Sequence, residues 1–178
     1  MDKIDRATKA IKFMLRNEDY RYDTKAKLEN LGDGAGLTFI GLTEKYDTKF
    51  LPFGMTIKAL AKLYSQDKLM ALAEIVSIYR AKYWNKRYDF INDERLAIRL
   101  FDFGVNCGVG TAVKVLQRAL GITATGKFDE ATCTKTNETA TAYTLFKKAA
   151  EGYYRSLRQF PKFGKGWLNR LNKDEYTK

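Results

Sequence analysis

Two carboxylates and a threonine in the N-terminal quarter of the chain have the residue types and spacing for acid–base chemistry. Glu18 continues the apolar face of a predicted helix, which carries Ile4, Ala7, Ile11, Met14 and Leu15 at helical spacing. A carboxyl group at the end of such a face is partly removed from water, which raises its pKa and keeps it protonated near neutral pH, as a general acid requires. Asp33 lies in a polar, glycine-rich stretch, where it can stay ionised. We therefore expect Glu18, Asp33 and Thr38 to line one cleft, although Glu18 could instead be a surface residue at a frayed helix end.

The stretch around Asp33 is rich in residues that shape a backbone. Its sequence from Asp33 to Thr43 is Asp-Gly-Ala-Gly-Leu-Thr-Phe-Ile-Gly-Leu-Thr. Glycines allow positive φ and let a substrate approach the main chain, and the alternation of apolar and polar residues at the end predicts a short strand. A purely structural hairpin is the alternative. The polar loop between Glu18 and Asp33 offers Tyr20 and Tyr22, which could stack on a ligand.

The elements that must position these residues are predicted to be mainly helical. The chain has 178 residues, 45% of them apolar, and only two prolines, which favours one compact helical unit with a small β element near residues 37–43. The expected helices are one capped by Thr56 over Ile57–Tyr64, then Gln66–Trp84, Arg95–Val105, Ala112–Leu120 capped by Thr111 and stopped by Gly121, and the longest, Glu138–Phe160, ended by Pro161.

Composition excludes several kinds of chemistry. The chain has no histidine, which removes the usual Ser-His and Cys-His pairs and most zinc sites, so we expect carboxylates as acid–base groups and no cofactor or metal. Lysine and arginine exceed aspartate and glutamate by 11, which indicates a polyanionic partner or ordinary solubility charge. Cys107 and Cys133 are expected to stay reduced. Because no apolar run reaches the length of a membrane span and the first residues are polar, we expect a cytoplasmic product without stable membrane insertion.

Some aromatic and polar residues leave two interpretations open. Tyr79, Tyr83 and Trp84 are interleaved with basic residues, a pattern found in nucleic-acid binding but more often in a protein core. Asp102 and Asn106 interrupt an apolar helix, where a polar group must be hydrogen-bonded, so each is either a structural clamp or part of the cleft.

Several blocks of the chain, in this order, resemble one known family. They are Glu18-Asp19-Tyr20, Asp33–Thr43, Tyr79-Arg80 with Tyr83-Trp84, Phe101–Gly108, and the C-terminal pieces Leu116–Gly121, Gly126, Thr132 and Gly166–Arg170. Within the second block, Asp33, Gly36, Thr38, Gly41 and Thr43 match the pattern Asp-Pro-Gly-Gly-Ala-Thr-Asn-x-Gly-Ile-Thr. From residue 11 to residue 171 the sequence is similar to glycoside hydrolase family 108, the N-acetylmuramidases found among phage endolysins and secretion-activating proteins.

The resemblance implies a mainly α, lysozyme-like fold and hydrolysis of the β-1,4 bond between N-acetylmuramic acid and N-acetylglucosamine. Glu18 would be the general acid, and Asp33 with Thr38 would hold the attacking water, with the carboxyl groups roughly 6.5–9.5 Å apart as in inverting enzymes. We assign to substrate binding Tyr20, Tyr22, Gly36, Tyr79, Tyr83, Trp84, Asp102 and Asn106. Residues 1–106 would form the catalytic region, and residues 107–178 a helical peptidoglycan-binding region packed on it.

The expected partners are peptidoglycan strands and anionic wall polymers, with no nucleic acid, for a monomer that acts on the cell wall after release or non-classical export. The family's Glu-Gly-Gly is replaced by Glu18-Asp19-Tyr20, which keeps a non-catalytic wall-binding or secretion-assisting module as the alternative. A nucleic-acid binder ranks last, because no groove-reading motif is present.

Overall fold

The computed structural model describes residues 5–18 and 26–173. Their contacts divide the chain into two compact units. We call residues Ile11–Lys82 the hairpin unit, and residues 5–10 with 83–173 the helical unit. The predicted boundary between residues 106 and 107 falls inside the helical unit, near the end of a helix, and the assignment of domains stays a prediction.

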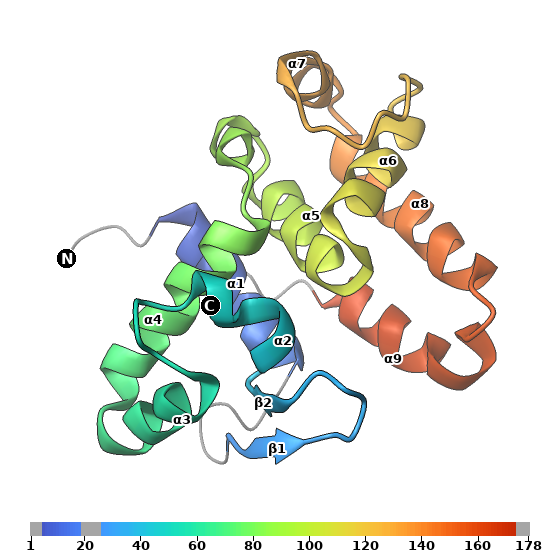
Figure 1. The fold of residues 1–178 in the computed structure, drawn as a ribbon. Coiled ribbons are helices and arrows are strands. Elements are labelled where there is room, and N and C mark those ends of the chain that lie inside the picture. The colour runs from blue at the N-terminus through green and yellow to red at the C-terminus, as the bar shows by residue number, and fades with distance from the viewer. Residues whose placement is uncertain (1–4, 19–25, 174–178) are drawn as a thin grey trace. The chain divides into compact units, whose positions relative to one another are not determined.

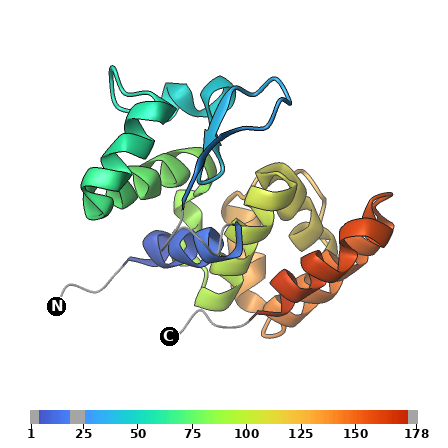
Figure 2. The same ribbon diagram turned by 90° about the horizontal axis from the view of Figure 1, so that it is seen from below.

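The hairpin unit combines a small antiparallel sheet with helices. Its elements are most of α1 (Arg6–Glu18), β1 (Leu28–Asn30), β2 (Leu37–Phe39), β3 (Leu42–Thr43), α2 (Glu44–Asp47), a 3-10 turn (Thr48–Phe50), α3 (Ile57–Gln66) and α4 (Lys68–Tyr83). The strands pair in the order β1-β2-β3, with Thr38 opposite Glu29 on one side and Thr43 on the other. The glycine-rich stretch forms the turn between β1 and β2, which run side by side in the hairpin (Figure 2).

The helical unit continues with a 3-10 turn (Lys86–Phe90), α5 (Glu94–Cys107), α6 (Val109–Ala119), α7 (Glu130–Glu138), α8 (Ala142–Ser156) and α9 (Phe160–Asn172). Helix α6 packs against α5 and α8, and α8 packs along α9 (Figure 1). The interior of this unit is aromatic, because the ring of Phe103 contacts the rings of Phe146 and Tyr154.

The predicted fold class is confirmed. The described chain is mainly α and lysozyme-like, and its small sheet includes residues 37–43. The apolar face predicted for the first helix is also confirmed, since Ala7, Ile11, Met14 and Leu15 are each at most 1% exposed. Burial of this stripe is the main reason why the segment is helical, because isolated helices of this length are marginal in water.

Three predicted helix boundaries are wrong. The helix expected over Glu138–Phe160 is the end of α7 followed by the shorter α8. Pro161 begins α9 instead of ending a helix, because the first turn needs no N–H from this residue. Helix α6 begins at Val109, before Thr111, because the chain breaks at Gly108, whose φ is +90°.

Candidate functional site

The turn that carries Asp33 is closed by that residue's own side chain. Asp33 Oδ1 accepts a hydrogen bond of 2.9 Å from the N–H of Ala35. Gly34 and Gly36 have φ values of +78° and +79°, which a side chain would disfavour. Asp33 is exposed, so the turn presents its carboxyl group to solvent.

A second carboxylate, that of Glu44, stabilises this turn through a hydrogen bond to its main chain. The sequence analysis missed this residue. Glu44 Oε2 accepts the N–H of Leu37 at 2.8 Å, and the N–H of Lys45 donates to the carbonyl of Ala35 at 3.1 Å. A Cβ placed on Gly36 would lie 2.5 Å from Glu44 Oε2. Gly36 therefore lets Glu44 approach the main chain. The signal that could have identified Glu44 is its position directly after Thr43, where an acidic residue starts a helix.

Thr38 follows the turn in β2. Its Oγ1 is buried and makes no hydrogen bond within the described part of the chain. A buried hydroxyl without a partner costs free energy, so such groups point to a functional role more often than paired ones do.

Two buried contacts hold β2, β3 and α2 in place. Tyr79 on α4 is 2% exposed and donates to the carbonyl of Ile40 at 3.1 Å, at a turn residue whose φ of +48° is unusual for a branched side chain. Asp47 is 1% exposed, accepts the N–H of Thr43 at 2.8 Å and pairs with Lys82 Nζ at 2.6 Å. Tyr79, predicted to bind substrate, therefore supports the hairpin from the interior.

The remaining predicted residues of the cleft are less fully described. Glu18 is the last residue of α1, and its side chain lies outside the described residues. Tyr20 and Tyr22 also lie outside them. The proposed separation between the carboxyl groups of Glu18 and Asp33 therefore stays a prediction.

In the helical unit, Tyr83 and Trp84 pack against other aromatic rings. Tyr83 meets Phe101 edge-on at a centroid distance of 6.4 Å, and Trp84 contacts Tyr88 and Phe101 at 5.4 and 5.7 Å. Trp84 Nε1 also donates to Asp89 at 3.3 Å. These contacts fit the core interpretation of this aromatic stretch, and the substrate-binding assignment of Tyr83 and Trp84 stays a prediction.

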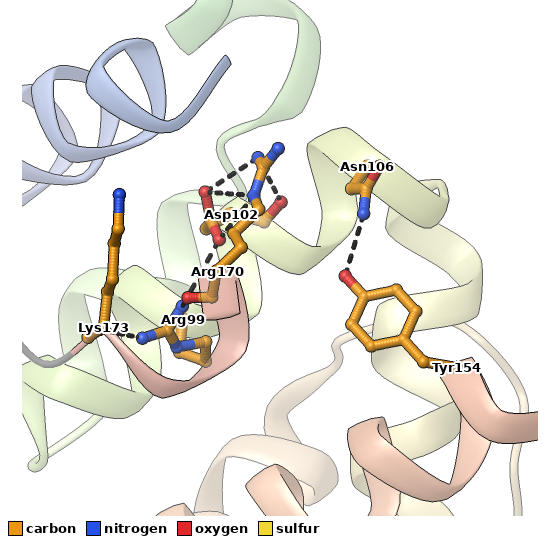
Figure 3. A network of polar contacts seen from close by, with 6 residues as sticks. All are labelled: Arg99, Asp102, Asn106, Tyr154, Arg170 and Lys173. Atoms are coloured by element: carbon orange, nitrogen blue, oxygen red, sulfur yellow. Dashed lines mark hydrogen bonds and ion pairs between the residues drawn. The ribbon is translucent and has the colours of Figure 1, made fainter. Parts of the chain in front are cut away.

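Asp102 is part of a buried ionic clamp (Figure 3). It is 2% exposed and accepts hydrogen bonds from Arg170 Nη2 at 2.9 Å and from Arg99 Nη1 at 3.4 Å. Arg99 also donates to the carbonyl oxygens of Arg170, at 2.8 Å, and Lys173, so one side chain on α5 caps the last turn of α9. These contacts show Asp102 as a structural clamp, and its assignment to substrate binding stays a prediction.

Asn106 lies further along α5 (Figure 3). Its Nδ2 donates to the hydroxyl of Tyr154 at 2.8 Å, although the residue is exposed. Burial raises the pKa of Tyr154 and is also the main reason why the pKa of the nearby Cys107 thiol is raised to about 11. Cys107 and Cys133 are both free thiols. The contact of Asn106 with Tyr154 links α5 to α8.

Gln117 is a second residue whose role the sequence analysis missed. It is 1% exposed, and its Nε2 donates to Thr125 Oγ1, the carbonyl of Lys127 and Thr132 Oγ1 at 3.0–3.1 Å, while its Oε1 accepts the N–H of Gly126 at 2.9 Å. This one amide organises the loop before α7. These contacts connect three of the C-terminal blocks, those that contain Gln117, Gly126 and Thr132.

Within residues 5–18 and 26–173, no group of three or more histidine, cysteine, aspartate or glutamate side chains could hold a metal ion. Over the same residues, no helix has both the length and the apolar character to cross a membrane.

Comparison with known proteins points to one family. No curated protein matches the chain. Among solved structures, the chain is similar to the one titled "Structure of Brucella abortus SagA", with a TM-score of 0.63 and 23% identity over 93% of this chain and 88% of that chain. This similarity shows the fold alone. Residues 27–108, which include Asp33 and Thr38 but not Glu18, match the family model described as glycosyl hydrolase 108. Over this segment the chain is therefore similar to glycoside hydrolases, a class that acts on glycans.

Proposed function

We propose that the protein is a peptidoglycan hydrolase, an N-acetylmuramidase that cleaves the β-1,4 bond between N-acetylmuramic acid and N-acetylglucosamine. The observation that carries the proposal is the segment from Asp33 to Thr38. It lies within the residues that match a glycosyl hydrolase family, and it combines an exposed carboxylate with a buried hydroxyl that has no partner in the described chain.

In this proposal, Glu18 protonates the leaving oxygen. Hydrolysis of a glycosidic bond passes through an oxocarbenium-like state and needs a protonated acid on one side of the sugar and a base or anion on the other. Asp33, on its polar turn, accepts a proton from the attacking water, and the hydroxyl of Thr38 orients that water. With room for a water, the two carboxyl groups would be roughly 6.5–9.5 Å apart, and the reaction would invert the anomeric carbon.

The remaining assignments belong to the same proposal. Gly36 would contact the glycan through its main chain, because Glu44 fills the space where a Cβ would be. Tyr20, Tyr22, Tyr83 and Trp84 would contact sugar rings. The region from residue 107 onward would bind peptidoglycan. The protein would work as a monomer at the cell wall, where its net charge of +11 attracts it to anionic polymers.

The proposal is tested by digesting purified peptidoglycan and identifying the released muropeptides by mass spectrometry. A reducing muramic acid end is expected from the wild type. We expect Glu18→Gln and Asp33→Asn to lower the rate by about 10²–10⁴-fold, the range for loss of a general acid or base. Asp67→Asn is a matched control, because it removes an exposed carboxylate before α4, keeps a side chain that can accept the N–H of Met70, and should leave the rate unchanged.

Other products would contradict the assignment. A reducing glucosamine end would indicate a glucosaminidase, and an anhydro end would indicate a lytic transglycosylase. If wild type binds peptidoglycan but releases no muropeptide, the non-catalytic module is the better account. Nuclear magnetic resonance of the new reducing end tests the stereochemistry, because an inverting enzyme first releases the α-anomer.

A further inference from the structure

Positive charge is concentrated in the helix pair α8 and α9. We call this helix pair the hairpin, which is not the hairpin unit defined above. Residues 142–173, which contain α8 and α9, have eight basic side chains and one acidic side chain, Glu151. The basic residues are Lys147, Lys148, Arg155, Arg158, Lys162, Lys165, Arg170 and Lys173. This segment therefore supplies seven of the net charges in a chain whose total is +11. The two helices lie side by side in both views (Figure 1, Figure 2).

Some of these cations are neutralised by neighbours in the hairpin or on α5. Arg170 binds the buried Asp102, and Arg155 pairs with Glu151 at 2.7 Å. The side chains of Lys148, Arg158, Lys162 and Lys165 are exposed. These four residues can therefore meet an anionic partner.

Two exposed glycines lie among these cations. Gly152 in α8 and Gly166 in α9 are inside their helices, and apart from the nearby backbone of the same helix no atom of the described residues lies within 4 Å of the place where a Cβ would be. Lys148 precedes Gly152 by four residues, and Lys162 precedes Gly166 by four, so each lysine shares a helix face with a glycine. Because alanine would stabilise an exposed helix, packing within the hairpin does not explain these glycines. Glycine allows a ligand to approach the main chain.

The hairpin does not fit a nucleic acid or a lipid surface well. Trp167 is stacked on Tyr154 at 5.3 Å, and Phe163 contacts Trp167 at 5.8 Å, so these rings already pack on one another instead of forming an open platform for bases. Within residues 142–173, Phe163 is the only large apolar side chain that is markedly exposed, at 46%, whereas a membrane-surface helix presents a broad apolar face. A partner that offers charge without bases or acyl chains fits best.

We propose that Lys148, Arg158, Lys162 and Lys165, together with Gly152 and Gly166, form a docking surface for a linear polymer of polyol phosphate. Its phosphates would pair with the four cations, and its slender backbone would lie against the bare helix surface at the glycines. This binding does not depend on hydrolysis by Glu18 and Asp33, so the failure of one proposal leaves the other standing.

The test measures binding of fluorescently labelled poly(glycerol phosphate) to the full chain by anisotropy, at several salt concentrations. The variant K148Q/R158Q/K162Q/K165Q should bind at least about tenfold more weakly, and the slope of log affinity against log salt should fall by about 3. The control K58Q/K86Q/K127Q/K135Q removes the same charge from exposed positions outside the hairpin and should stay within about twofold of wild type. Equal weakening by both variants would overturn the proposal in favour of diffuse attraction.

A second variant separates the glycines from charge. G152A/G166A should raise the melting temperature, because alanine is the better helix former, and should still weaken polymer binding. Unchanged binding by this variant would contradict the docking surface. Binding of single-stranded DNA of the same charge, or of anionic phospholipid vesicles, as tightly as the polymer would also overturn it.

Discussion

Replacing Gly36 by alanine should show how strongly the Asp33 turn depends on Glu44. Alanine at a φ of +79° costs about 1–2 kcal/mol. The new methyl group would also lie 2.5 Å from Glu44 Oε2, which must move and lose its bond to the N–H of Leu37. A hydrogen bond to a charged group contributes about 1.5–3 kcal/mol. We therefore expect Gly36→Ala to lower the free energy of unfolding by about 2.5–5 kcal/mol.

Gly34 provides the matched control for this prediction. Its φ of +78° is nearly the same, but within residues 5–18 and 26–173 nothing beyond its own chain neighbours lies within 4 Å of its Cβ position. Gly34→Ala should therefore show only the backbone cost of about 1–2 kcal/mol. Urea unfolding followed by circular dichroism measures both variants, and peptidoglycan clearing should fall further in Gly36→Ala, because its turn is displaced.

A double-mutant cycle tests the cause. In a Glu44→Ala background the 2.5 Å clash with Oε2 is removed and only the Cβ of residue 44, at 3.1 Å, stays close. Gly36→Ala should then cost little more than Gly34→Ala, with a coupling of about 2 kcal/mol between positions 36 and 44. Equal losses for the two glycine variants in the wild-type background would refute the role of Glu44.

Two further predictions concern the helical unit. Asp102→Asn should lower the free energy of unfolding by about 3–5 kcal/mol, because it leaves Arg99 and Arg170 without their buried counter-charge. In the same urea titration, Glu138→Gln, at an exposed site, should change the free energy of unfolding little. A small loss for Asp102→Asn would contradict the clamp. Burial raises the pKa of Cys107 to about 11 from an ordinary 9.0, so the thiol should react slowly with a disulfide reagent at pH 8. The contribution of the buried neutral thiol to stability should be complete below pH 9 and should be lost as the pH rises toward 11. Urea titrations between pH 8 and 11 should therefore show a weaker pH dependence for Cys107→Ala, and rapid labelling of Cys107 at pH 8 would contradict its burial.

Sequence patterns predicted the parts of the fold that depend on residues close together in the sequence. The apolar stripe of α1 and the glycine-rich turn with its short strand follow directly from spacing and backbone preference. Helix α7 was missed because its sequence, rich in threonine, has little apolar periodicity and is held by the Asp129 cap and by Gln117. Pro161 is compatible with either end of a helix, and only the preceding turn decides between them.

Only some residues of the candidate site could be selected from the sequence, because local patterns do not report contacts between distant residues. Asp33 and Thr38 could be chosen because the turn between them has its own signature. Glu44 acts through a contact across the turn, and the partner of Asp102 is 68 residues further along the chain. A single sequence gives residue types and spacing, but it does not identify which distant side chains meet, so a clamp and a cleft residue could not be distinguished at Asp102.

The bonds from Arg99 to the end of α9 bear on how the chain folds as it is synthesised. They join residues 71 and 74 positions apart, and they neutralise and cap groups that are buried in the finished unit. While the ribosome is still making α9, Arg99 and Asp102 have each other but not Arg170, so α5 holds an ion pair that is only partly satisfied. Closing such a long loop is slow compared with forming local helices. The helical unit should therefore reach its native state only after Lys173 has emerged from the ribosome.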